Sequence, residues 1–272
     1  MVFGRRGITH SVFVMPVLAL LLAYAFRRWT SFKSLGPLIG LSALGVFLHT
    51  GMDLFNSWGV RPFAPFSDYR LGNGWLGIVD PWIWLILGVG LLAGFLRPAW
   101  SLAANRGALG LLVPWILFCG ASHGLGVAHF REAIGRLRVN SDRVEAYAQL
   151  MEPLRWCVVA ATPDRYYQGD VHALRGLQGR VRVFFRSEIP EQLKGPFTAA
   201  YLRWASAPLV RPLAAGQGGG LALVDLRFMS RTRGMPFVVR LYADPLGRAA
   251  HAWLAWQMGP PVPDQEYELP PL

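Results

Sequence analysis

Four apolar stretches divide the first half of the chain. Each is close to the roughly 20 residues that a helix needs to cross the hydrocarbon core of a bilayer. The short polar segments at 27–34 and 97–106 predict that consecutive helices run antiparallel as neighbours. The pattern therefore predicts about four transmembrane helices, at 11–26, 35–55, 81–96 and 107–128.

The first stretch also fits a second interpretation. Arg5 and Arg6 precede an apolar run that ends in the small-residue sequence AYA at 23–25, as in a cleavable signal peptide. Cleavage there would remove His10, and three further apolar stretches follow. We therefore expect this stretch to be an uncleaved membrane helix, and a signal peptide is the alternative.

From about residue 131 the pattern changes to short runs of β-branched and aromatic residues, which is typical of strands. Two segments have a helical pattern instead, namely 141–151, with Ser141 or Asp142 as its N-cap, and 195–209. The predicted strands are CVVAAT, RYYQGDVHAL, RVRVFF, LALVDLRFM, PFVVRLYA and HAWLAWQM. The expected organisation is an α-helical membrane domain at 1–130, a small α+β extramembrane domain at 131–258 and a proline-rich tail at 259–272.

Composition agrees with a protein that lies partly in a bilayer. Hydrophobic residues make up 53% of the chain and charged residues only 16%, whereas a soluble domain has about 25% charged residues. The net charge of +11 is spread along the chain with no basic stripe between aromatics, so we expect no nucleic-acid partner. The bases flank the apolar stretches, where membrane lipids are the expected partners. Two cysteines give no disulfide framework.

The reactive groups of the membrane half are distributed to one side. If the four helices alternate in direction, one face receives residues 1–10, 54–80 and everything after 128. The opposite face receives only the two short loops, which carry bases and no acid. All the acids and histidines of this half lie near the first face: Asp53, Asp68, Asp80, His10, His49, His123 and His129. Imidazoles and carboxylates that converge at a membrane surface indicate a metal site.

The strongest signal within this set is at the end of the second stretch. His49, Asp53 and Asn56 are spaced i, i+4 and i+7, so they project from one face of a helix. An aspartate near a bilayer is costly unless it is paired or ligated. We therefore expect His49 and Asp53 to be metal ligands and His10 to be a third, oriented by Thr9 or Ser11.

Simpler explanations stay open for several members. His49 and Asp53 could be an interfacial polar pair, and His10 could stand beside an ordinary helix cap. Asp80 followed by Pro81 is also what the start of a helix favours. Asp68 could be an exposed loop acid. His123 and His129 have only their position to recommend them.

Several motifs give the chain a family resemblance. They are RRGITHS at 5–11, HTGMDLFNSWGVRPFAPFSD at 49–68, IVDPW at 78–82, and DRYYQGDV and LVDLRF in the second half. In this order they resemble the bacterial inner-membrane-associated metal-dependent hydrolases, also described as LexA-binding inner-membrane hydrolases, over most of the chain to about residue 245.

The resemblance implies a metal-dependent hydrolase with a helical core related to zinc-dependent phospholipase C. It implies His10, His49 and Asp53 as ligands, with Asp80 as a possible further one. Family members usually begin with an additional helix that carries a histidine and an Asp-x-Asp segment, and Arg5 stands where the family motif has its first histidine. We therefore expect either a later start than in the family or an incomplete set of ligands.

The expected function is metal-assisted hydrolysis of a phosphoester or lipid-linked ester at the inner membrane, by a multi-pass protein. Mixed His and Asp ligation suits a divalent ion, Zn²⁺ or Mn²⁺. Asp80 or Asp68 is the candidate general base, and the candidate substrate-binding residues are Arg6, Arg61 and Arg70. The alternative is a non-catalytic inner-membrane protein whose extramembrane domain binds a protein partner.

Overall fold

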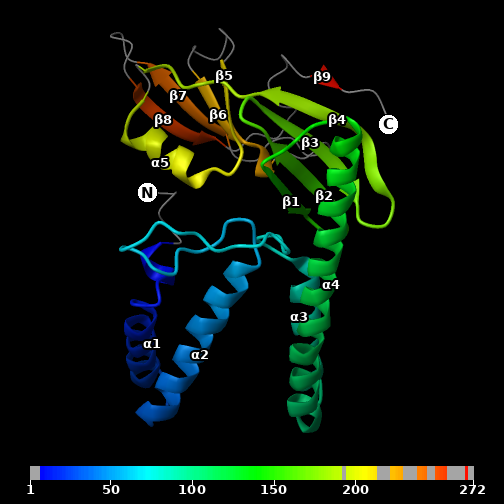
Figure 1. The fold of residues 1–272 in the computed structure, drawn as a ribbon. Coiled ribbons are helices and arrows are strands. Elements are labelled where there is room, and N and C mark those ends of the chain that lie inside the picture. The colour runs from blue at the N-terminus through cyan, green and yellow to red at the C-terminus, as the bar shows by residue number, and fades with distance from the viewer. Residues whose placement is uncertain are drawn as a thin grey trace. The chain divides into compact units, whose positions relative to one another are not determined.

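The computed structural model describes residues 7–191, 194–212, 221–228, 238–243, 249–255 and 267–268. The chain forms two compact units, Met1–Val79 and Asp80–Leu272. The first unit is helical, and the second consists of a helical hairpin and two antiparallel sheets (Figure 1).

The first unit is built on two packed helices, α1 (Met15–Trp29) and α2 (Leu35–Leu54). The small side chains of Ala19 and Ala23 are buried, which allows α1 and α2 to approach closely. A one-turn helix, η2 (Ile8–His10), precedes α1. The loop 55–79 then crosses the end of the pair, and one parallel and one antiparallel bridge join residues within this loop (Figure 1).

The second unit begins with a hairpin of α3 (Pro81–Leu96) and α4 (Ser101–Arg136), joined by the one-turn helix η3 (Pro98–Trp100). The two helices touch at Gly90, where an added Cβ would lie 2.6 Å from the Cβ of Ala108. At a rise of about 1.5 Å per residue, α4 is roughly 54 Å long, well beyond the hydrocarbon thickness of about 30 Å. Its last turns therefore extend out of any bilayer that its first turns cross.

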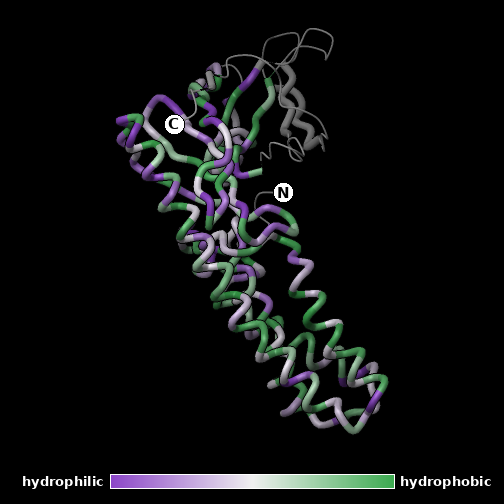
Figure 2. Tube along the Cα trace, turned by 90° about the vertical axis from the view of Figure 1, so that its right-hand side faces the viewer, coloured by the Kyte–Doolittle hydropathy of each residue, from purple (hydrophilic) through white to green (hydrophobic). Residues whose placement is uncertain are grey.

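Within the described part of the chain, two helical segments are long and apolar enough to cross a membrane, Leu35–Leu54 and Pro98–Arg136, the second of which joins η3 and α4. Only 17% and 22% of their apolar windows are buried in protein, so most of these residues are exposed, unlike those of a core helix. Figure 2 shows the helices coloured mainly toward the hydrophobic end of the scale. Four spanning helices are not shown, because α3 has 16 residues and α1 has 15. The α1 helix starts later than predicted since residues 11–14 form a turn.

Two antiparallel sheets form the rest of the second unit. The first has the order β1-β2-β3-β4-β9 and the second β5-β6-β7-β8. The strands are β1 (Arg143–Gln149), β2 (Glu152–Ala161), β3 (Arg165–His172), β4 (Gly176–Phe185), β5 (Pro208–Pro212), β6 (Leu221–Asp225), β7 (Val238–Ala243), β8 (Ala249–Ala255) and β9 (Tyr267–Glu268). All six predicted runs contain strands. In the fourth run, LALVDLRFM, the strand β6 ends at Asp225 and a one-turn helix, η6 (Leu226–Phe228), follows.

Two predicted helices need correction. The helix predicted at 141–151 is wrong, because β1 occupies most of this segment. Its consecutive residues Ala146 and Tyr147 are both buried, on opposite faces of the sheet, so pairing with β2 overrides the helix propensity of the segment. The helix predicted at 195–209 ends early, as α5 (Pro196–Trp204). The residue before Pro208 is disfavoured in a helix, and β5 begins at that proline.

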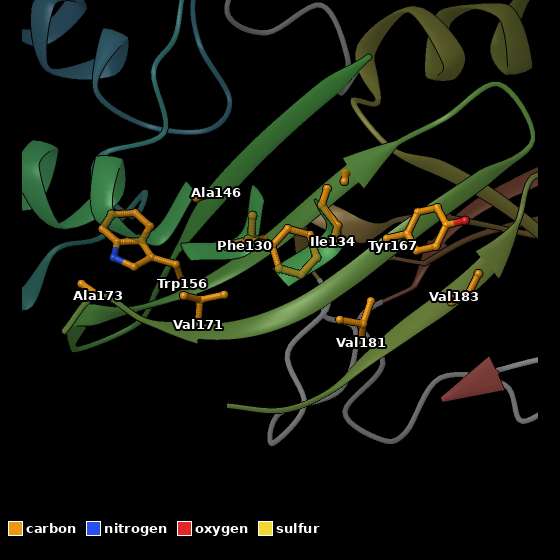
Figure 3. Packing of buried hydrophobic residues seen from close by; sticks show 11 residues of the cluster. Phe130, Ile134, Ala146, Trp156, Tyr167, Val171, Ala173, Val181 and Val183 are labelled. Carbon is orange, nitrogen blue, oxygen red and sulfur yellow. The ribbon is translucent and has the colours of Figure 1, made fainter. Parts of the chain in front are cut away.

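The first sheet is buried on both faces. Alternate residues of β2 explain this, because Trp156 and Val158 pack against α4 while Cys157 packs against the second sheet. Phe130 of α4 lies at the centre of the helix side and is fully buried (Figure 3). Truncation of such a phenylalanine costs about 3–5 kcal/mol. The end of α4 is therefore part of the core of the antiparallel sheet domain.

Candidate metal centre

The last turns of α2 bring polar side chains to one side, as the spacing predicts. Asp53 is 8% exposed and Asn56, just beyond the helix, is 4% exposed. His49, one turn earlier, is exposed. A buried carboxylate therefore lies at the end of an apolar helix, where its charge needs a partner.

His10 approaches this carboxylate from η2. Its Nε2 lies 3.0 Å from Oδ2 of Asp53, and its ring centroid lies 5.3 Å from that of His49. The hydroxyl of Thr9 lies 2.9 Å from the other ring nitrogen of His10. A partner on Nδ1 fixes the tautomer and the direction in which Nε2 points, which is the arrangement found around metal-binding histidines. The expected orienting role thus falls to Thr9.

Ser11 has a different role. Its fully buried hydroxyl donates to the carbonyl of Ala64 over 2.6 Å, and the Val12 amide donates to the carbonyl of Pro62 over 2.9 Å. These bonds attach the His10 segment to the loop 55–79, although more than 50 residues separate them in sequence. The loop therefore positions one ligand while α2 positions the other two.

Asn56 orients Asp53. Its side-chain oxygen accepts the backbone amides of Trp58 at 2.9 Å and Gly59 at 3.2 Å. Because the oxygen of the Asn56 amide faces these two donors, its NH₂ group faces Asp53. The NH₂ group donates to Oδ1 of Asp53 over 2.9 Å. The carboxylate is thus held through Oδ1 with Oδ2 turned toward His10. The i+7 spacing places Asn56 on this face, but its orienting role emerges only from the turn that follows α2.

The three predicted ligands lie close enough to hold one ion. One ligand atom each from His10, His49 and Asp53 lies within 4.8 Å of the others. Nε2 of His10 and Oδ2 of Asp53 lie 3.0 Å apart, so both could bind one ion at the length of about 2.0–2.1 Å that zinc bonds to nitrogen and oxygen have. Two imidazoles and a carboxylate suit Zn²⁺ or Mn²⁺ and leave a coordination position for water. The donor set therefore fits the expected divalent ion.

The predicted arginines lie beside one another on the loop. Val60 pairs with Leu71 in the antiparallel bridge, which places Arg61 opposite Arg70. Arg61 is bound to Asp68, whose side chain is 76% exposed, at 3.0 Å. Arg6 lies outside the residues that the structure describes. Asp68 thus forms a surface ion pair, in keeping with the alternative of an exposed loop acid.

Asp80 belongs to the second unit and caps α3. Its Oδ1 accepts the amides of Trp82 and Ile83, and its Oδ2 lies 3.4 Å from the indole nitrogen of Trp115. These are the bonds of an N-cap followed by a proline, which was the simpler explanation. A role for Asp80 in catalysis stays a prediction.

His123 and His129 lie on the part of α4 that packs against the first sheet. The ring of His123 stands edge-on to Trp156, with centroids 5.2 Å apart. Nε2 of His129 lies 3.1 Å from the carbonyl oxygen of Ala173. Both rings have structural contacts within the second unit, which explains them without a metal.

Comparison with known proteins supports a membrane setting. Residues 1–129 match the family described as YdjM inner membrane protein. No curated protein and no solved structure matches the chain. The matched residues include η2, α2 and the whole His10–His49–Asp53 cluster. The family and the two apolar helices support an inner-membrane location, and the chain is a membrane-associated protein whose first 129 residues are similar to an inner membrane protein family.

Proposed function

We propose that this protein is a metal-dependent hydrolase that cleaves a phosphoester or a lipid-linked ester at the inner membrane. The observation that carries the proposal is the convergence of His10, His49 and Asp53 within 4.8 Å. Their ligand atoms come from two segments that only the folded loop 55–79 brings together. The two orienting contacts, from Thr9 and Asn56, support a site organised for binding.

A bound divalent ion supplies Lewis acidity and lowers the pKa of a bound water to about 7. His10 and His49 contribute imidazole lone pairs, and Asp53 contributes negative charge that offsets the charge of the ion. In the hydrolysis the oxygen of water bonds to the phosphorus or carbonyl carbon. The bond to the ester oxygen breaks, and the leaving oxygen takes up a proton.

A carboxylate of the chain would carry that proton. Oδ1 of Asp80 already accepts two backbone amides as the N-cap of α3. Asp68 has the exposed side chain and is the better candidate, although it must leave Arg61 to act. Arg61 and Arg70, opposite each other on the loop, are suited to hold an anionic group, and Arg6 keeps the same expected role.

The test is the metal content of the detergent-purified chain, measured by elemental analysis. We expect close to one equivalent of zinc or manganese in the wild type and its loss in His49→Ala and Asp53→Ala. The matched controls are His172→Ala and Asp142→Ala, which change the same residue types in the second unit and should keep the metal. Equal loading in all five proteins would refute the assignment of the ligands.

The second candidate function is a non-catalytic inner-membrane protein whose extramembrane domain binds a protein partner. One observation favours it. In the second unit, β1 is an edge strand of the described part of the first sheet. The cluster of possible ligands found among the described residues belongs to the first unit, so a partner at β1 would not need the metal. An edge strand can accept a strand from a partner. Purified wild-type protein without bound metal, and without uptake of added zinc or manganese, would favour this function.

A further inference from the structure

Large apolar side chains lie exposed on the two segments of the first unit that the Ser11 and Val12 hydrogen bonds join beside His10. They lie on η2, on the turn that follows it and on the loop 55–79, and between 45% and 80% of each is exposed. We call them the apolar rim: Ile8, Val12, Phe13, Phe63, Phe66 and Tyr69. Grouped exposure of this kind marks an interaction surface rather than chance.

The apolar rim is ordered by the fold. Phe13 and Phe66 meet edge to face with ring centroids 5.3 Å apart. The Val12 amide donates to the carbonyl of Pro62, and the Ser11 hydroxyl donates to the carbonyl of Ala64. The same bonds that position His10 thus also position the rim. An aromatic pair held this way has already lost most of the conformational entropy that binding would cost.

The rim continues into a surface that faces lipid. The α1 helix begins two residues after Phe13, and its exposed side chains include Val17, Leu20 and Leu21. Its neighbour α2 is apolar, mostly exposed and long enough to cross a bilayer. A bilayer that covers the apolar surface of these helices therefore reaches the rim, since there is no polar break between them.

Charge indicates which lipids fit. Arg61 and Arg70 lie opposite each other on the loop that carries Phe63, Phe66 and Tyr69, and a guanidinium can bind a phosphate through two parallel hydrogen bonds. Aromatic side chains next to basic ones are typical of the headgroup level of a membrane. His10 precedes Val12 of the rim by two residues, which places the metal centre near that same level.

We propose that the apolar rim docks into the bilayer and that the substrate is a phospholipid of that same membrane. Its acyl chains would lie along the rim and α1, its phosphate beside the arginines, and its ester at the His10–His49–Asp53 cluster. The substrate class rests on the proposed function, whereas the docking surface does not. A second protein chain is the competing occupant of the rim, and the experiment distinguishes the two.

The docking surface is tested by spin labels on the full chain in nanodiscs of phosphatidylglycerol and phosphatidylcholine. Both native cysteines are buried, so an introduced cysteine can be labelled alone, with wild type as the control for labelling. We expect a label at Phe66→Cys to be more accessible to oxygen than to a water-soluble nickel complex. A label at Leu174→Cys, 68% exposed in the second unit, should show the reverse.

Two results would overturn the docking surface. A Phe66→Cys label that the nickel complex reaches as readily as it reaches the Leu174→Cys label would place the rim in water. A label shielded from both reagents would show that protein covers it. The measurement needs neither metal nor turnover, so its failure is distinct from failure of the proposed function.

The substrate class is tested with the metal-loaded chain in vesicles of phosphatidylglycerol. We expect hydrolysis of the embedded lipid to be at least tenfold faster than that of a short water-soluble phosphodiester at equal concentration. Faster hydrolysis of the soluble ester would overturn the inference and leave the proposed function intact. Hydrolysis of neither by a protein with metal bound would overturn the substrate class and the proposed function together.

Discussion

Among the residues that the structure describes, each compact unit buries one aspartate, and the two are compensated in different ways. Asp225, in the second unit, is 1% exposed, and it accepts the amides of Ser206, Ala207 and Arg227. The Arg227 guanidinium adds two further contacts at 2.7 and 2.8 Å. Asp53, in the first unit, is met by the amide of Asn56 and by the imidazole of His10.

The two partners differ in whether they can donate a lone pair to a metal ion. A guanidinium is permanently charged and has no lone pair to offer, so Asp225 and Arg227 form a closed structural pair. An imidazole can be neutral and then donates a lone pair toward a cation. Burial of a carboxylate alone therefore says little about function, and the chemistry of its partner separates a structural element from a candidate metal site.

The largest effect is expected for Arg227→Met. Removal of the guanidinium leaves Asp225 charged in a buried site, which costs about 3–5 kcal/mol. The thermal unfolding of the sheets in detergent, followed by circular dichroism, should shift to lower temperature. The metal content should not change, because the cluster lies in the other unit.

The double variant Asp225→Leu with Arg227→Met is the control for this effect. It removes both charges, so most of the stability should return. A double variant no more stable than Arg227→Met would contradict the explanation by an uncompensated charge.

Chelation should act on the other aspartate. Removal of the ion from the wild type should lower the thermal stability of the first unit by about 2.7 kcal/mol when the free metal had been at 100 times its Kd. Asp53→Ala should be insensitive to chelator. Equal sensitivity of both proteins, measured by thermal unfolding with and without chelator, would show that the ion acts elsewhere.

A smaller effect is expected for Asn56→Leu, which keeps a similar volume and removes the donor to Asp53. Loss of an orienting contact of this kind weakens metal binding about 10–100-fold. The Kd for zinc, measured by competition with a chelating dye, should rise by that factor. Since the side chain also holds the turn at Trp58 and Gly59, the thermal midpoint of the metal-free protein is measured in parallel. A lower midpoint with an unchanged Kd would give Asn56 a purely structural role.

The smallest effect concerns thiol chemistry. Complete burial raises the pKa of the Cys157 thiol to about 12, with Asp170 adding to the shift. At pH 8 the reactive thiolate is then about one part in ten thousand. Native protein should not react at this position with iodoacetamide, while detergent-denatured protein should react fully. Labelling of native Cys157, detected by peptide mass spectrometry, would show that the two sheets separate.

The candidate ligands could be predicted from sequence because they depend on local geometry. The spacing of His49 and Asp53 fixes a shared helix face, whatever the rest of the fold. Their convergence with His10 could not be derived in the same way, since it depends on the contacts of Ser11 and Val12 with the loop 55–79. The orienting amide of Asn56 depends on the turn at Trp58 and Gly59 and was equally hidden.

The errors in secondary structure have the same origin. Residues 141–151 contain good helix formers, and only pairing with β2 commits them to a strand. The predicted fourth apolar stretch, 107–128, lies within the much longer α4. The C-terminal turns of α4 continue beyond this stretch because they pack against the first sheet. Local propensity does not contain that information.

The sequence by itself determined the apolar helices, most of the strands and the residue types at the candidate metal centre, because periodicity and spacing act over a few residues. The tertiary structure decided which histidine meets Asp53, which acids act as caps or surface pairs, and which apolar side chains stay exposed beside the cluster. Those outcomes depend on contacts between segments distant in sequence. In the first unit the loop 55–79 bonds to Ser11 and Val12, and in the second unit the end of α4 packs against the first sheet.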